Sequence, residues 1–193
     1  MNYFSLRRLL RNKRALGTPV ANLIIMVAAV LLATAVVAYA MSLTTSQVQK
    51  EKVYIATTHL WYVNSTESIA AIGISNIGST DVVLTQINVN GLLCQWNGTT
   101  NYVVYSVIQG PIPGDLPLDE EISNTANTNI TIGGQPFTFS AASEGLTIKS
   151  GYSVAFYIVV PNLISIYALS TPVQMTIKTA QGVYFTETLV QST

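Results

Sequence analysis

The clearest pattern in the chain is an uninterrupted apolar stretch near its N-terminus. Residues 16–49 contain no charged side chain, and the densest part, Val20–Met41, is broken only by Asn22 and Thr34. A helix of about 20 apolar residues crosses a bilayer, whereas the core of an ordinary cleaved signal has about 7–15. The pattern therefore predicts a hydrophobic helix over residues 16–50.

A different pattern begins after Lys52, where β-branched and aromatic residues are interrupted by Gly, Asn and Pro. Such punctuated runs predict short strands. The predicted strands are Val53–Val63, Ser68–Ser75, Val82–Val89, Tyr102–Ile108, Phe137–Phe139, Leu146–Ile148, Tyr152–Val160, Val173–Thr179 and Val183–Val190.

The segments between these strands complete the predicted architecture. Residues 109–129 contain three prolines and no clear periodicity, which predicts a long loop. Residues 180–182 predict a tight hairpin connection. Many short strands at close spacing are typical of an antiparallel β-sandwich. The predicted fold class is α+β: a long N-terminal hydrophobic α-helix followed by an all-β, Ig-like antiparallel sandwich over residues 51–193.

Charge is scarce and unevenly placed. Charged residues make up 9% of the chain, against about 25% in ordinary soluble domains. Five of the nine basic residues lie within the first 14 positions, and the rest of the chain holds four bases against all nine acids. A basic head suits a cytoplasmic leader on an exported domain. The acidic body lacks the basic patch that nucleic-acid binding needs, so we expect no nucleic-acid partner.

Basic residues and a small residue directly precede the apolar stretch, in the order Lys13-Arg14-Ala15-Leu16. An ordinary secretory signal places its cleavage site after the apolar core instead. The arrangement resembles the class III signal peptide of archaeal type IV pilins and archaellins. That resemblance implies that prepilin peptidase recognises Lys13 and Arg14 and cuts between Ala15 and Leu16. Residues 1–15 would then be a cleaved leader, and the helix would stay with the protein.

Weaker similarities to the same family occur in the β region. Residues 75–83 resemble a recurring strand–turn–strand of these proteins, as do residues 146–151 followed by a long strand and residues 179–182. The chain departs from the family at Val20, where bacterial pilins and many archaellins carry a glutamate. This departure favours an adhesion-type pilin over an archaellin.

The resemblance implies a structural rather than an enzymatic role, with the helix buried among copies of itself in an extracellular filament. Before assembly the membrane would cover the helix, which is apolar on all sides. Implied partners are further copies of the chain in a helical homopolymer, prepilin peptidase, an assembly ATPase and a membrane platform protein. Alternatives are an archaellin, a membrane-anchored extracellular sugar-binding protein and a plain signal anchor. The residues expected in the filament core are Leu16, Val20, Ala21, Ile24, Ala28, Leu31, Ala35 and Ala38.

Three sequons match the pattern for N-glycosylation, at Asn64, Asn97 and Asn129. Each falls in a predicted turn or loop, where a glycan could be accommodated. Because charge is scarce in this region, glycans would supply hydration that charged side chains do not. We therefore predict that at least one of the three is modified.

The sequence contains no recognisable catalytic or metal-binding motif, so we predict no catalytic residue, no metal and no cofactor. His59 is the only histidine, and Cys94, the only cysteine, is expected in a strand. The acidic residues after Gly114 predict a solvated loop, with a calcium site as the alternative: Asp115, Asp119, Glu120 and Glu121. Several aromatic residues are expected in the core or a subunit interface rather than on a sugar-binding surface: Trp61, Tyr62, Trp96, Tyr102 and Tyr105.

Overall fold

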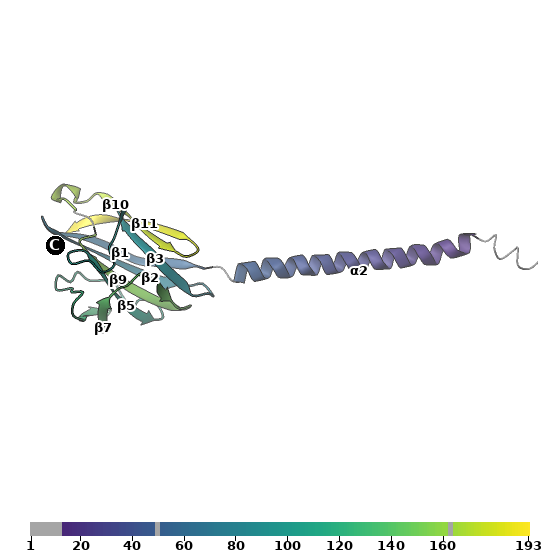
Figure 1. Cartoon of the computed structure of the whole chain (residues 1–193), viewed down its shortest axis with the longest axis horizontal. Helices are drawn as coiled ribbons and strands as arrows, with labels where there is room; N and C mark the ends of the chain where they lie inside the picture. The colour runs from purple at the N-terminus through teal and green to yellow at the C-terminus, as the bar shows by residue number, and fades with distance from the viewer. Residues whose placement is uncertain (1–12, 49–50, 162–163) are drawn as a thin grey trace, which may run out of the picture. The chain divides into compact units, whose positions relative to one another are not determined.

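The computed structural model describes residues 13–48, 51–161 and 164–193. These residues form two compact units, a single long helix and a β domain (Figure 1). The helix, α2 (Lys13–Val48), begins slightly before the predicted boundary at Leu16 and confirms the predicted hydrophobic helix. The predicted helical residues 49–50 lie outside the described residues.

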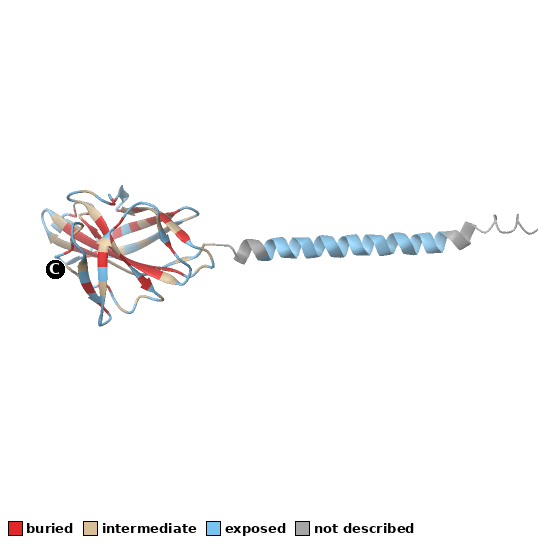
Figure 2. Ribbon diagram, turned by 60° about the horizontal axis from the view of Figure 1, so that its bottom comes forward, coloured by how far each residue is buried: buried red, intermediate tan, exposed pale blue. Residues whose placement is uncertain are grey.

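Length and composition make α2 able to cross a membrane. The segment Gly17–Thr44 has 28 residues and none of it is buried (Figure 2). At about 1.5 Å per residue it is about 42 Å long, more than the roughly 30 Å hydrocarbon core of a bilayer. The hydroxyls of Thr34 and Thr44 donate to backbone carbonyls one turn earlier, both at 2.9 Å. These bonds lower the cost of placing hydroxyls in apolar surroundings.

The β domain contains eleven strands among its described residues, together with one short 3-10 helix, η1 (Ile166–Ala168). The strands pair in the order β4-β3-β10-β11-β1-β2-β9-β5-β7-β6, and β8 pairs with β3. Their bounds are β1 (Val53–Asn64), β2 (Glu67–Asn76), β3 (Val82–Val89), β4 (Leu92–Leu93), β5 (Tyr102–Gln109), β6 (Thr128–Ile132), β7 (Gln135–Ala141), β8 (Leu146–Ile148), β9 (Tyr152–Val159), β10 (Pro172–Thr179) and β11 (Val183–Ser192).

All nine predicted strands are present, within two residues at most of their ends. The exceptions to the prediction are local. β4 and β6 were not expected, so the long loop covers residues 110–127 rather than 109–129. Cys94 lies just after β4 and not within a strand. η1 interrupts the expected all-β order between β9 and β10.

One pairing is parallel rather than antiparallel. β1 lies beside β11 in parallel, with Leu60 opposite Val190. The reason is that β2 occupies the other edge of β1, while the hairpin of β10 and β11 brings the last strand alongside β1 in the same direction. The sheet is therefore mostly, and not entirely, antiparallel.

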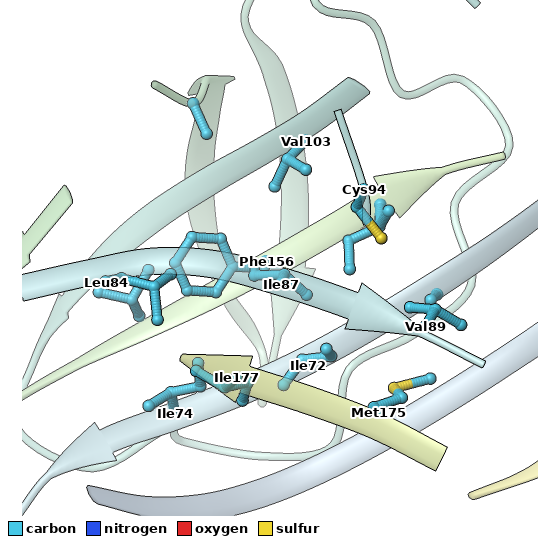
Figure 3. Packing of buried hydrophobic residues seen from close by; sticks show 14 of the residues in the cluster. Ile72, Ile74, Leu84, Ile87, Val89, Cys94, Val103, Phe156, Met175 and Ile177 are labelled. Carbon is cyan, nitrogen blue, oxygen red and sulfur yellow. The ribbon is translucent and has the colours of Figure 1, made fainter. Parts of the chain in front are cut away.

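The larger core lies on one face of the central strands β1, β2, β9 and β5. Side chains of β2 and β9, such as Ile72 and Phe156, pack against Leu84 of β3 and Ile177 of β10 (Figure 3). Phe156 also meets the ring of Trp96 edge-on, with the ring centroids 6.4 Å apart. This packing joins β3 and β10 to the central strands as a second layer.

A second core covers the opposite face of the same strands. There the β6–β7 hairpin and the 110–127 loop supply Phe139 and Leu116, which pack against Tyr157 of β9 and its neighbours. The rings of Phe139 and Tyr157 meet edge-on at 5.2 Å. β2 and β9 are consequently buried along almost their whole length.

Replacing Phe156 by alanine should destabilise the β domain by about 3–5 kcal/mol, because the fully buried ring leaves a cavity. The matched control is Phe185→Ala on β11, where the ring is 70% exposed and the expected change is within about 0.5 kcal/mol. Both tryptophans of the chain lie in the β domain. Denaturant unfolding of the detergent-solubilised chain, followed by tryptophan fluorescence, measures the difference. Equal destabilisation by the two variants would contradict the layered core.

Candidate functional site

The residues predicted to form a filament core lie along α2. Their described side chains are all exposed, and apolar residues surround the helix instead of forming one stripe. These exposed residues are Val20, Ala21, Ile24, Ala28, Leu31, Ala35 and Ala38. The backbone of Lys13, Arg14, Ala15 and Leu16 is helical, but their side chains lie outside the described part of the structure.

The β domain has a groove of about 650 Å³ at the end of the central strands where β1 begins. It lies beside the start of the 110–127 loop, on the face of the sheet that the loop covers. No charged side chain lines it. Its apolar and aromatic wall consists of Tyr54, Ala56, Ile77, Pro111, Ile112 and Tyr152.

Several polar side chains in the groove already have hydrogen-bond partners within the β domain. The Ser153 hydroxyl donates to the carbonyl of Gly110 at 2.6 Å, and it lies 2.7 Å from the Ser75 hydroxyl. The Asn76 amide donates to the carbonyls of Thr80 and Ile148 at 2.8 and 3.0 Å. Since these groups need no further partner, the groove favours an apolar or aromatic occupant over a charged one.

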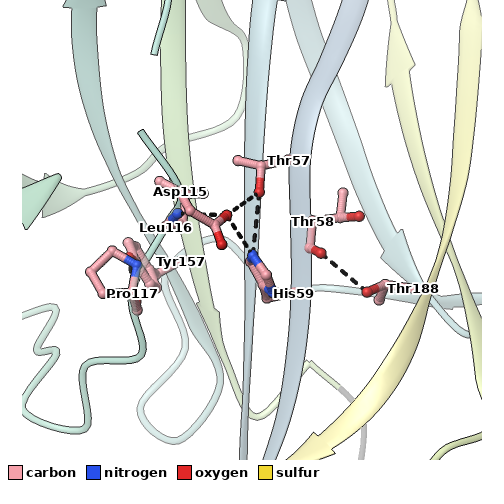
Figure 4. A network of polar contacts seen from close by, with 8 residues as sticks. All are labelled: Thr57, Thr58, His59, Asp115, Leu116, Pro117, Tyr157 and Thr188. Carbon is pink, nitrogen blue, oxygen red and sulfur yellow. Dashed lines mark hydrogen bonds and ion pairs between the residues drawn. The ribbon is translucent and has the colours of Figure 1, made fainter. Parts of the chain in front are cut away.

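Next to the groove, a polar cluster ties the 110–127 loop to β1 (Figure 4). Nε2 of His59 lies 2.7 Å from Oδ1 of Asp115, and the Thr57 hydroxyl donates to the same oxygen at 2.7 Å. The hydrogen bond from His59, followed by that from Thr57, lowers the pKa of the Asp115 carboxyl. The Tyr157 hydroxyl anchors the same loop by donating to the carbonyl of Pro117 at 2.6 Å.

The cluster of Thr57, His59 and Asp115 does not have the geometry of a nucleophilic triad. A triad uses both imidazole nitrogens, one for the acid and one for the hydroxyl. Here both oxygens approach Nε2, while Nδ1 is buried without a hydrogen-bond partner. The His59 ring also stacks on Trp61, with centroids 5.0 Å apart. The arrangement holds the loop in place, and sequence alone could not pair residues 56 positions apart.

The asparagines of the three sequons are all exposed. Asn64 ends β1, and its Oδ1 accepts hydrogen bonds from the backbone N–H and the hydroxyl of Thr66 at 2.9 and 2.8 Å. Asn97 lies in the segment before β5. Asn129 lies in β6, contrary to the predicted loop, and accepts a hydrogen bond from Thr138 of β7. Its side chain faces outward because Ile130 and Ile132 turn into the core.

Other residues singled out from the sequence are mostly structural. Trp61 and Trp96 are buried and Tyr62, Tyr102 and Tyr105 half-buried, which confirms their expected place in the packing. Burial raises the pKa of the Cys94 thiol to about 12. Within residues 13–48, 51–161 and 164–193, no three His, Cys, Asp or Glu side chains gather in a way that could hold a metal ion.

Comparisons with known proteins give no family. No family model matches the chain, and no curated protein matches it. Three solved structures show a distant likeness to 75% of the chain. The ligand-binding region of serine-glutamate repeat protein A from Enterococcus faecium has 10% identity and a TM-score of 0.32 over 98% of its length.

The other two structures are less similar. Spo0M, a sporulation control protein from Bacillus subtilis, has 9% identity and a TM-score of 0.29, with 49% of its length covered. A GH20 exo-β-N-acetylglucosaminidase from Vibrio harveyi has 10% identity and a TM-score of 0.19, with 18% covered.

The bond between His59 and Asp115 should make the stability of the β domain depend on pH. A carboxyl with a lowered pKa in the folded state stabilises the fold above its unfolded-state pKa, and this contribution is lost as pH falls through the folded pKa. Lowering the pH from about 5 to about 2 should therefore destabilise the wild type more than Asp115→Asn. Unfolding free energies of both chains measured across this range test it. Parallel pH profiles would contradict the role of Asp115.

We predict that at least one of the three exposed sequons carries a glycan. Replacing Asn64, Asn97 and Asn129 by glutamine, singly and together, should lower the intact mass by one glycan for each occupied site. Thr66→Ala is the control for the first sequon, because it keeps Asn64 but removes the hydroxyl that the sequon requires. A wild-type mass equal to that of the polypeptide would contradict the prediction.

Proposed function

We propose that this chain is the structural subunit of an extracellular archaeal type IV pilus that polymerises through α2 and serves surface adhesion. The observation that carries the proposal is a helix whose Gly17–Thr44 segment is free of charge and exposed on every side. Such a helix must be covered by something other than water. Lipid would cover it in the precursor, and other copies of α2 would cover it in the filament.

The composition of α2 suits close packing of helices. Lipid tails are about as apolar as leucine, so helices leaving a bilayer gain little hydrophobic free energy and associate through packing. Small residues let helix axes approach closely, and α2 has many alanines, among them Ala21, Ala28, Ala35 and Ala38. Because the balance between lipid and filament is near zero, assembly would draw on the ATPase and the membrane platform protein that the pilin resemblance implies.

Pro19 supports the proposed cleavage site. In an α-helix the N–H of residue i bonds to the carbonyl of residue i−4, so Pro19 leaves the Ala15 carbonyl without its donor. After cleavage between Ala15 and Leu16, that carbonyl is removed with the leader. Pro19 is then among the first four residues of the mature helix, whose N–H groups have no helical partner in any case. The proline thus weakens the helix only in the precursor.

The leader also explains why assembly would wait for cleavage. Its five basic residues cannot enter an apolar filament core without a large desolvation cost. They also oppose the positive end of the helix dipole. Removing residues 1–15 eliminates both effects.

For the β domain we propose an Ig-like sandwich displayed on the filament surface. The packing of β3 and β10 against the central strands supports this reading. The exposed sequons fit a surface that faces water, since glycans would supply hydration in a domain poor in charge. Archaellin remains the alternative within the same architecture, and a membrane-anchored sugar-binding protein is the alternative of a different class.

The proposal predicts that material sheared from cells is filamentous and contains a chain beginning at Leu16. Ala15→Leu, which replaces the small residue at the cleavage site, should keep the chain in the membrane with residues 1–15 attached. N-terminal sequencing and intact mass of the sheared and membrane fractions measure both. Abundant filaments from Ala15→Leu would contradict the role of cleavage. A wild-type chain found only in membranes would overturn the pilus assignment and favour an anchored domain.

A further inference from the structure

The loop between β9 and β10 presents an exposed aromatic side chain on an ordered turn. Tyr167 is 93% exposed and its neighbour Ile166 is 54% exposed. The turn is nevertheless fixed, because the Ser165 hydroxyl accepts a hydrogen bond from the N–H of Tyr167 at 3.1 Å. The Thr171 hydroxyl donates to the carbonyl of Ala168 in the same turn. We call Ile166 and Tyr167 together the apolar knob.

Both described ends of this loop have unusual backbone conformations. Val160 has φ of 49° and Ser170 has φ of 61°. A positive φ is rare for residues other than glycine and is a clear outlier for a β-branched residue such as Val160. Each residue is held by a backbone hydrogen bond to the sheet, from Val160 to Ser68 and from Ser170 to Val190. Strain of this kind persists where the surrounding structure imposes it, and it gathers at functional positions.

The apolar knob and the groove lie at opposite ends of the β domain. The groove contains Tyr54 at the start of β1, opposite Ser75 and Ser153 in the sheet register. The knob loop follows Val159, which pairs with Ile69 near the far end of β1, and it lies beside the C-terminal part of β11 (Figure 1). Ile69 pairs with Trp61 of β1, seven residues beyond Tyr54, so at about 3.3 Å per residue the two features are separated by roughly 23 Å along the strand.

The chemistry of the two features matches. Residues 160–171 contain no charged side chain, and none lines the groove. Bringing them together therefore buries no charge, and Ser153 and Asn76 of the groove already have hydrogen-bond partners within the domain. A groove of about 650 Å³ falls in the size range of sites that hold small organic ligands. It has room for a tyrosine ring with an adjacent isoleucine side chain, and Tyr54 and Pro111 provide rings for it to contact.

We propose that the apolar knob of one copy inserts into the groove of a neighbouring copy. The inference rests on the proposed polymer and adds a contact between β domains to the contacts between helices. Because two different surfaces meet, the contact is heterologous, and a joined pair keeps one free knob and one free groove. Such a contact can therefore add further copies, and it forms an open helical filament when the rotation between copies does not close into a ring.

Cysteine cross-linking tests the proposal in intact filaments. Ala56→Cys in the groove and Ile166→Cys in the knob leave Tyr167 unchanged, and the native Cys94 is buried and unreactive at neutral pH. Filaments of the double variant, treated with a short thiol–thiol cross-linker, should give a ladder of dimers, trimers and longer oligomers on a denaturing gel. Filaments of either single variant should give none. The pair Ala56→Cys with Leu93→Cys is the matched control, since Leu93 is 54% exposed in β4 but does not belong to the knob.

Substitutions at Tyr167 give an independent measurement. Tyr167→Asp would bring a charge into the groove and should reduce the yield of sheared filaments about tenfold or more. Tyr167→Phe keeps the ring and should leave the yield unchanged. Wild-type filaments combined with no ladder, or a normal yield from Tyr167→Asp, would overturn this inference and leave the pilus proposal intact. If the wild type forms no filaments, the pilus proposal itself fails. If the double-cysteine variant forms no filaments, the filament yields of Tyr167→Asp and Tyr167→Phe test the inference by themselves.

Discussion

The β domain depends on one constraint: β2 and β9 have side chains to bury on both faces. Ile72 and Phe156 project to one side of these strands, and Ala71 and Tyr157 to the other. A sheet with one face exposed to solvent would leave one of these two sets of side chains in water. β3 and β10 cover the first side, and the second must be covered by what the remaining chain can supply, namely the β6–β7 hairpin and the loop 110–127. This explains why a long loop without regular structure is so firmly fixed.

The fixing of that loop in turn creates the groove and the polar cluster. Gly73 in β2 lets the loop approach closely, because a Cβ there would lie 2.5 Å from Cδ1 of Ile112 and 2.9 Å from Cγ2 of Thr57. Ile112 forms part of the groove wall, and Leu116 fills the core beside it. Between them, Asp115 turns outward to His59. The burial of its apolar side chains therefore holds the loop against the sheet, and the bond between Asp115 and His59 fixes its position along β1.

The sequence was informative where local pattern decides structure. The long apolar, uncharged stretch within residues 16–49 was enough to predict α2, and runs of β-branched and aromatic residues between Gly, Asn and Pro were enough to locate nine strands. β6 was not predicted, because Asn127 and Asn129 are typical of turns, although Ile130 and Ile132 face the core. Local pattern could not predict contacts between residues that are distant in the sequence. The bond from His59 to Asp115, the parallel pairing of β1 with β11 and the groove all depend on how the chain folds back. The knob was missed because a tyrosine in a short apolar run normally predicts burial.

Scarcity of charge links the two units of the chain. A soluble domain normally uses charge to keep its surfaces hydrated and apart, and at 9% charged residues this chain has little available for that purpose. The helix has no charge from Gly17 to Thr44, and the β domain has an uncharged groove at one end and an uncharged loop at the other. Surfaces without charge can meet without the cost of stripping water from ions. In the proposed filament, the same scarcity of charge would lower the cost of contact between copies, at the helices and at the ends of the β domains alike.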